Sequence, residues 1–205
     1  MTIIAAYADH HQVIIGCDTA TDYAGTAIYK TDGKIGRLDA AYGQTVLLGV
    51  AGNSAILPVL LRKLSIEDQP DYRNDAACDR WANNIAEAAT EILADANPAL
   101  LSTRGDTQSI DGIGILAWRH HMWFLQTHSV IRPHPGILAI GSGTDIALGS
   151  LHTSHRAGAD PEHAVRVAVE LACAHADGCK IDDRGPVLHT TMPGVPVPVR
   201  RRSAA

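Results

Sequence analysis

Two strand-rich blocks, each followed by a pair of helices, alternate along this chain of 205 residues. Strands are expected where apolar and β-branched residues form short runs, and helices where apolar residues recur every three to four positions. The expected strands cover residues 2–7, 13–17, 34–38, 44–50, 110–118, 122–130, 137–140 and part of 187–199. The expected helices cover residues 54–64, 76–96, 145–156 and 161–175, and the Thr-, Gly- and Asp-rich stretch 19–33 is expected to be a loop.

This order favours one architecture. Sheets and amphipathic helices must each cover an apolar face, and two antiparallel sheets packed face to face with a helix pair on each outer side satisfy all of them. The prediction is therefore a four-layer αββα sandwich of the α+β class. With 46% hydrophobic residues, one domain over residues 1–195 can bury a sizeable core, and residues 196–205 form a basic tail.

Charge and composition exclude several classes of protein. A net charge of −5 argues against a nucleic-acid-binding surface, and no apolar run reaches the length of about 20 residues that spans a bilayer. The N-terminus has no basic region of a signal peptide, and the four cysteines have no framework spacing. A reduced, cytoplasmic protein is expected.

Thr2, Asp18 and Lys34 form the candidate site. Asp18 follows Thr2 by 16 residues, and Lys34 follows Asp18 by the same interval. A hairpin that returns from Thr2 brings Asp18 back beside it, and the strand that starts at Lys34 can lie next to both. Removal of Met1 would leave Thr2 with a free α-amine, which titrates at about 7.7–8.0 and can serve as the general base for its own hydroxyl. The alternative without a catalytic role is a surface Asp–Lys pair beside an ordinary N-terminal threonine.

Four stretches resemble the proteasome β-subunit family, and more narrowly the HslV-like peptidases. They are Ile14-Ile15-Gly16-Cys17-Asp18, Lys34-Ile35-Gly36-Arg37-Leu38, Gly49-Val50-Ala51-Gly52-Asn53 and Ala139-Ile140-Gly141-Ser142-Gly143. The order of the motifs and elements fits to about residue 175. The resemblance implies the sandwich fold of N-terminal nucleophile hydrolases.

The resemblance also implies catalytic roles. Thr2 would be the nucleophile and its amine the base, with Asp18 and Lys34 as charged partners. The N–H of Gly52 would stabilise the oxyanion, and Ser142 would hydrogen-bond the amine.

Substrate contacts follow from the same resemblance. Thr21, Asp22 and Ser54 would flank an extended substrate, and Val50 would form the base of the pocket for the residue before the scissile bond. The loop after the last helix, residues 178–186, lacks the serine that the family has there, and Asp183 is the substitute acceptor for the amine.

The predicted activity is threonine-type endopeptidase hydrolysis inside an oligomeric chamber, with peptides or unfolded proteins as substrates and no cofactor. Homo-oligomeric rings are implied, and a ring ATPase that feeds substrate is a partner that such an assembly allows. A small-molecule amidase and a catalytically silent scaffold subunit are the alternatives.

Other polar groups are interpreted without a function. The His10-His11 and His120-His121 pairs are expected to be solvated turn residues, and Cys173, His175 and Cys179 lack the spacing of a zinc site, so no metal is expected.

Overall fold

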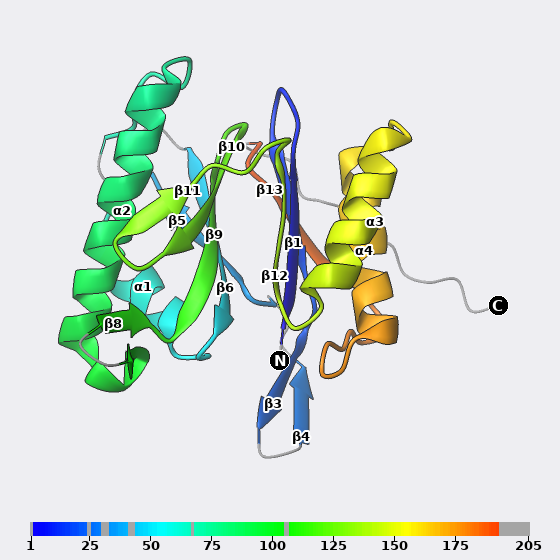
Figure 1. Cartoon of the computed structure of the whole chain (residues 1–205), viewed down its shortest axis with the longest axis horizontal. Helices are drawn as coiled ribbons and strands as arrows, with labels where there is room; N and C mark the ends of the chain where they lie inside the picture. The colour runs from blue at the N-terminus through cyan, green and yellow to red at the C-terminus, as the bar shows by residue number, and fades with distance from the viewer. Residues whose placement is uncertain are drawn as a thin grey trace.

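Four layers of helices and sheets make up the structure, a computed structural model that describes residues 2–23, 26–29, 33–40, 44–66, 68–104 and 107–192 (Figure 1). Helices α1 and α2 form one outer layer, two antiparallel sheets form the middle, and helices α3 and α4 form the other outer layer. The predicted αββα sandwich is confirmed. Met1 and the basic tail 196–205 lie outside the described residues.

The sheet that carries the chain start has four strands in the order β12-β1-β2-β13. Its strands are β1 (Ile3–Ala8), β2 (Val13–Cys17), β12 (Ile137–Gly141) and β13 (Val187–Thr190). Its outer face is covered by α3 (Thr144–Arg156) and α4 (Pro161–His175). Helix α4 starts as the sequence predicts, because the Asp160 side chain accepts a hydrogen bond from the His163 N–H and Pro161 occupies the first turn.

The second sheet has five strands in the order β11-β10-β9-β6-β5. They are β5 (Ile35–Asp39), β6 (Thr45–Gly52), β9 (Gly112–Trp118), β10 (His121–Gln126) and β11 (Ser129–Ile131). Helices α1 (Ile56–Lys63) and α2 (Asp75–Ala96) cover it. In the described ranges of the chain, no helix combines the length and the apolar character that crossing a membrane requires.

Strict alternation along the strands separates three hydrophobic cores. In β1, Ile3 faces the α3–α4 pair while the next residue, Ile4, faces the second sheet. In β6, Leu47 faces the first sheet while Leu48 faces α1 and α2. Because successive side chains of a strand point to opposite faces, each sheet is apolar on both faces. One face packs on the other sheet and the other face packs on a helix pair.

The structure corrects the expected loop over residues 19–33. Strands β3 (Ala20–Tyr23) and β4 (Thr26–Tyr29) pair as an antiparallel hairpin that projects from the end of the sandwich near the N-terminus (Figure 1). Its Thr and Tyr residues favour strands, but the neighbouring Gly and Asp residues obscured that signal.

A second hairpin was also missed. A short 3₁₀ helix (Pro98–Leu100) leads into β7 (Leu101–Arg104), which pairs with β8 (Thr107–Ile110). Helix α1 starts two residues later than expected, with Ala55 as its N-cap, and the Asn53 side chain accepts a hydrogen bond from the Ala55 N–H.

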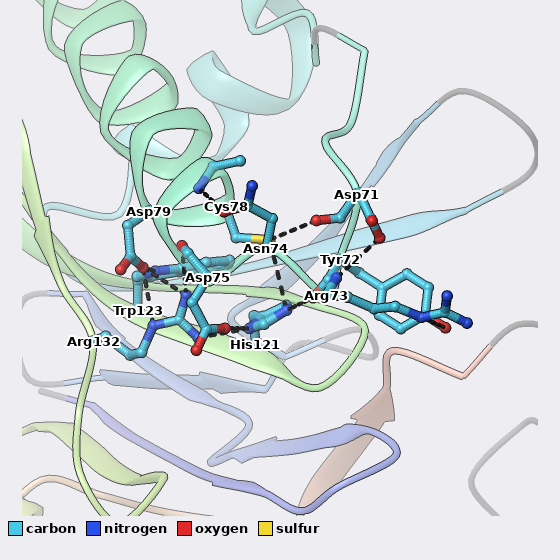
Figure 2. A network of polar contacts seen from close by, with 11 residues as sticks. Asp71, Tyr72, Arg73, Asn74, Asp75, Cys78, Asp79, His121, Trp123 and Arg132 are labelled. Atoms are coloured by element: carbon cyan, nitrogen blue, oxygen red, sulfur yellow. Dashed lines mark hydrogen bonds and ion pairs between the residues drawn. The ribbon is translucent and has the colours of Figure 1, made fainter.

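His121 is buried, so its interpretation as a solvated turn residue was wrong. It begins β10 with 1% of its surface exposed, and its ring lies between the Tyr72 carbonyl and the Arg132 guanidinium (Figure 2). Nε2 lies 2.7 Å from the Tyr72 oxygen, which can only accept, so this nitrogen carries the proton and Nδ1 accepts from Arg132. Arg132 in turn binds the Asp79 carboxylate, and this network joins the start of α2 to the five-stranded sheet.

Candidate active site

Thr2, Asp18 and Lys34 meet at one end of the sandwich. The Lys34 Nζ lies 2.8 Å from both Asp18 oxygens and donates a hydrogen bond to the Thr2 hydroxyl at 3.0 Å. Thr2 directly precedes β1, Asp18 directly follows β2, and Lys34 directly precedes β5 of the other sheet. The three residues meet as predicted, but Lys34 comes from the other sheet and not from a strand beside the hairpin, so the contact bridges the two sheets.

The Asp18–Lys34 pair is desolvated. Asp18 is 0% exposed and Lys34 is 7% exposed, and the carboxylate also accepts a hydrogen bond from the Ile3 N–H at 2.9 Å. Burial raises the pKa of the Asp18 carboxyl above its ordinary value, while the Lys34 ammonium and the N–H donors act in the opposite direction. A buried ion pair of this kind holds a cation beside the Thr2 hydroxyl, where it favours the alkoxide form.

Ser142 contacts the other side of Thr2. Its N–H donates to the Thr2 carbonyl at 2.8 Å, and its Oγ lies 3.4 Å from the Thr2 nitrogen. Gly141, which pairs with Ile3 across β1 and β12, has a φ of 106°, and a Cβ there would lie 2.0 Å from the Thr2 carbonyl oxygen. Only glycine lets β12 approach Thr2 this closely, so Gly141 sets the position of Ser142.

Cys179 is a residue that the sequence interpretation did not assign to the site. Its Sγ lies 3.3 Å from the Ser142 Oγ, and it is 2% exposed. Burial raises the pKa of the Cys179 thiol, so the group is a neutral thiol at physiological pH. The only signal in the sequence was a cysteine in the loop that lacks the expected serine.

Asp183, the expected acceptor for the amine, is exposed in a turn within that loop. The loop reaches the site through its backbone instead, because the Lys180 N–H lies 3.4 Å from an Asp18 oxygen and the Lys180 carbonyl accepts from the Thr19 N–H at 3.1 Å. In the described ranges, no hydrogen bond joins Asp183 to Thr2.

An open cavity of about 750 Å³ adjoins Thr2. Gly52 and Ser142 lie on its wall, and most of its remaining surface is apolar, from Ile113, Phe124 and Ile140. Gly52 has a φ of 122°, and a Cβ there would lie 2.5 Å from the Gly112 Cα, so only glycine fits this end of β6.

The residues expected to contact substrate do not line this cavity where their side chains are described. Thr21 and Val50 are half-buried and Ser54 is exposed, and the side chain of Asp22 lies outside the described part of the structure. Val50 packs against the core between the five-stranded sheet and α1–α2 and donates its N–H to the Lys34 carbonyl at 3.3 Å. Neither Thr21, Val50 nor Ser54 lines the cavity beside Thr2.

In the portion of the chain that the structure describes, no group of three or more His, Cys, Asp or Glu side chains is arranged to hold a metal ion. The groups around Thr2 are an ammonium, a carboxylate, a hydroxyl and a thiol. They are suited to tuning a nucleophile and its proton.

Comparison with solved structures decides the fold. BPH from Thiobacillus denitrificans superimposes with a TM-score of 0.68 at 19% identity, over 96% of this chain and 100% of that one. HslV from Trypanosoma brucei superimposes with a TM-score of 0.63 at 18% identity, over 92% of this chain and 98% of that one. The chain has the HslV-like fold.

A second BPH structure, solved in complex with epoxomicin, matches the HslV-like fold of this chain with a TM-score of 0.66 at 19% identity. It covers 95% of this chain and 100% of the BPH chain. No protein-family model and no curated protein sequence matches the chain. The predicted resemblance to HslV is thus confirmed at the level of the fold, although the sequence identity is low.

Proposed function

We propose that the protein is a threonine-type endopeptidase whose nucleophile is the Thr2 hydroxyl and whose base is the Thr2 α-amine after removal of Met1. The observation that carries the proposal is the position of Thr2 between two groups, with Lys34 on its hydroxyl and Ser142 on its nitrogen. The HslV-like fold and the cavity at Thr2 support it.

The chemistry follows from this position. The Thr2 Oγ1 attacks a peptide carbonyl and its proton passes to the α-amine, which is within the same residue. The oxyanion that forms is stabilised by the Gly52 N–H in this proposal, and a donor of this kind contributes on the order of 3 kcal/mol. The C–N bond then breaks and the leaving nitrogen takes the proton from the α-ammonium. Water attacks the resulting ester, with the amine again as base, and restores the Thr2 hydroxyl.

We further propose that copies of the chain assemble into closed rings, with a ring ATPase as a candidate supplier of substrate. The β3–β4 hairpin projects from the body and exposes Ile28 and Tyr29, which are 52% and 47% exposed (Figure 1). Such apolar surface on a projecting two-stranded hairpin favours a protein contact. Light scattering is expected to give a multiple of 21.8 kDa, and a monomer at all concentrations would contradict the assembly.

Labelling tests the nucleophile. A peptide vinyl sulfone, which adds irreversibly to an activated hydroxyl, is expected to add one inhibitor mass at Thr2 and to abolish hydrolysis of an unfolded protein. Thr2→Ala should give neither label nor hydrolysis, while Thr2→Ser retains both in part, because the hydroxyl and the amine remain.

Epoxomicin, the ligand found in BPH, is a second probe and should raise the melting temperature of the wild type. Peptide hydrolysis by Thr2→Ala at the wild-type rate would contradict the proposal. Labelling with cleavage of small amides alone would indicate the amidase instead.

A further inference from the structure

The cavity beside Thr2 adjoins one of the two groups that contact this residue. Its wall includes Ser142, whose Oγ lies 3.4 Å from the Thr2 nitrogen. Lys34, which contacts the Thr2 hydroxyl, does not line it. The cavity is therefore on the amine side of Thr2.

Proton transfer fixes which half of a substrate enters that side. When the C–N bond breaks, the leaving nitrogen must be within hydrogen-bond reach of the group that protonates it. In the proposed mechanism this group is the Thr2 α-ammonium, whose nitrogen lies 3.4 Å from the Ser142 Oγ. The leaving segment must therefore approach from the Ser142 side, while the acyl segment stays bonded to the hydroxyl.

The lining gives the chemistry of the occupant. Ile113 is 37% exposed at the cavity, and Phe124 and the buried Ile110 and Ile140 complete an apolar wall. The volume of about 750 Å³ is within the range of pockets that enclose organic ligands, about 300–1,000 Å³. The charged side chain at this wall is Asp111, which is exposed and accepts a hydrogen bond from the Asn53 amide at 3.2 Å.

We infer that this cavity binds the residue that follows the scissile bond and selects for a large apolar side chain there. The inference rests on the proposed function, because it needs Thr2 to be the nucleophile. It assigns a specificity site on the leaving-group side, distinct from the positions of Thr21, Val50 and Ser54.

Two substrate series separate the halves of the site. The first is a set of peptides with one common acyl segment and Leu, Phe, Gly or Asp directly after the scissile bond. The second is the methyl ester of the same acyl segment, whose methanol leaving group is too small to use the cavity. The wild type should cleave the Leu and Phe peptides at least about tenfold faster, in kcat/KM, than the Gly and Asp peptides.

Ile113→Asp should remove this preference, because it places a charge in the apolar wall. Hydrolysis of the methyl ester should fall by a smaller factor than hydrolysis of the Leu and Phe peptides, because methanol does not occupy the cavity. Ile131→Asp is the matched control, since Ile131 is an exposed isoleucine of the same sheet that does not line the cavity. Ile113→Trp provides a second variant that reduces the volume, and it should shift the preference from Phe toward Gly.

Three results would overturn the inference. The first is an unchanged preference in both Ile113 variants, and the second is an equal fall in ester and peptide hydrolysis. The third is a wild type that shows no preference after the scissile bond. A wild type that hydrolyses neither peptides nor the ester would instead refute the proposed function itself.

Discussion

Replacing Lys34 by Met is expected to destabilise the protein as well as to abolish its activity. The side chain has a similar length, but the Asp18 carboxylate loses an ammonium that lies 2.8 Å from both of its oxygens. Because Asp18 is 0% exposed, water cannot replace the lost partner. Removing one member of a buried pair costs about 3–5 kcal/mol, which lowers the melting temperature of a chain of this size by roughly 6–20 °C.

A double-mutant cycle isolates the ion pair from the rest of the site. Asp18→Asn combined with Lys34→Met removes both charges and leaves an amide oxygen that can accept from the Ile3 N–H. The double variant should return to within about 1 kcal/mol of wild-type stability, since two neutral groups carry no buried charge. It should remain inactive, because the cation beside the Thr2 hydroxyl is gone.

The pH dependence of the stability deficit is an independent test of the buried-charge reasoning. Burial raises the pKa of Asp18, whereas the Lys34 ammonium lowers it. Removing Lys34 should therefore raise the pKa of Asp18 further. A group with a raised folded-state pKa favours the folded state at low pH and loses that contribution as the pH rises. The stability deficit of Lys34→Met should therefore shrink between pH 7 and pH 5.

Urea denaturation followed by circular dichroism measures these quantities, with Lys63→Met on the exposed end of α1 as the matched control. A Lys34→Met variant within about 1 kcal/mol of the wild type at pH 7 would refute the buried-charge reasoning. So would a deficit that grows at acid pH.

Two further predictions concern groups around the site and the α2 network. Cys179→Ala should lower kcat and shift the acid limb of the kcat–pH profile, because the Ser142 Oγ loses a polar neighbour. Cys179→Ser should restore both, since it returns a polar group. An alanine variant with the wild-type pH profile would remove Cys179 from the site. Burial lowers the pKa of His121, so its stabilising contribution is full above its ordinary value of about 6.5 and is lost as the pH falls below it. The loss of stability from pH 7 to pH 5 should accordingly be smaller in His121→Gln than in the wild type and in the exposed control His152→Gln, and equal slopes for all three would contradict the assignment.

The sequence was most informative where local periodicity decides the structure. Nearly continuous apolar runs predicted β1 and β6, which are buried on both faces, and the apolar spacing of α2 predicted its length to within one residue. The β1–β2 hairpin brings Asp18 back beside Thr2, so their meeting could be foreseen. These features depend on residues close in the chain or on one strand pairing. Lys34 was expected from an adjacent strand, and it instead reaches the pair from β5 of the other sheet.

The features that were missed depend on contacts between distant segments. The cavity joins residues 110–113 with residues 139–142 and Thr144, and its walls come from both sheets, so no local pattern could reveal it. The contact of Cys179 with Ser142 links residues 37 positions apart. His121 was misjudged because a histidine after a polar turn is usually solvated, whereas here Tyr72 and Arg132 satisfy both ring nitrogens.

The central claim is that the Thr2 amine is the catalytic base, and its most direct test compares two forms of the chain that differ only at the N-terminus. One form begins at Thr2 after cleavage of an N-terminal fusion, and the other retains Met1 because a glutamate is inserted before Thr2. Intact mass establishes each terminus, and vinyl sulfone labelling and peptide hydrolysis are then measured at equal concentration. The form that begins at Thr2 should label and turn over, while the blocked form should do neither, since its nitrogen is an amide without basicity. Equal labelling and turnover by the blocked form would contradict the mechanism.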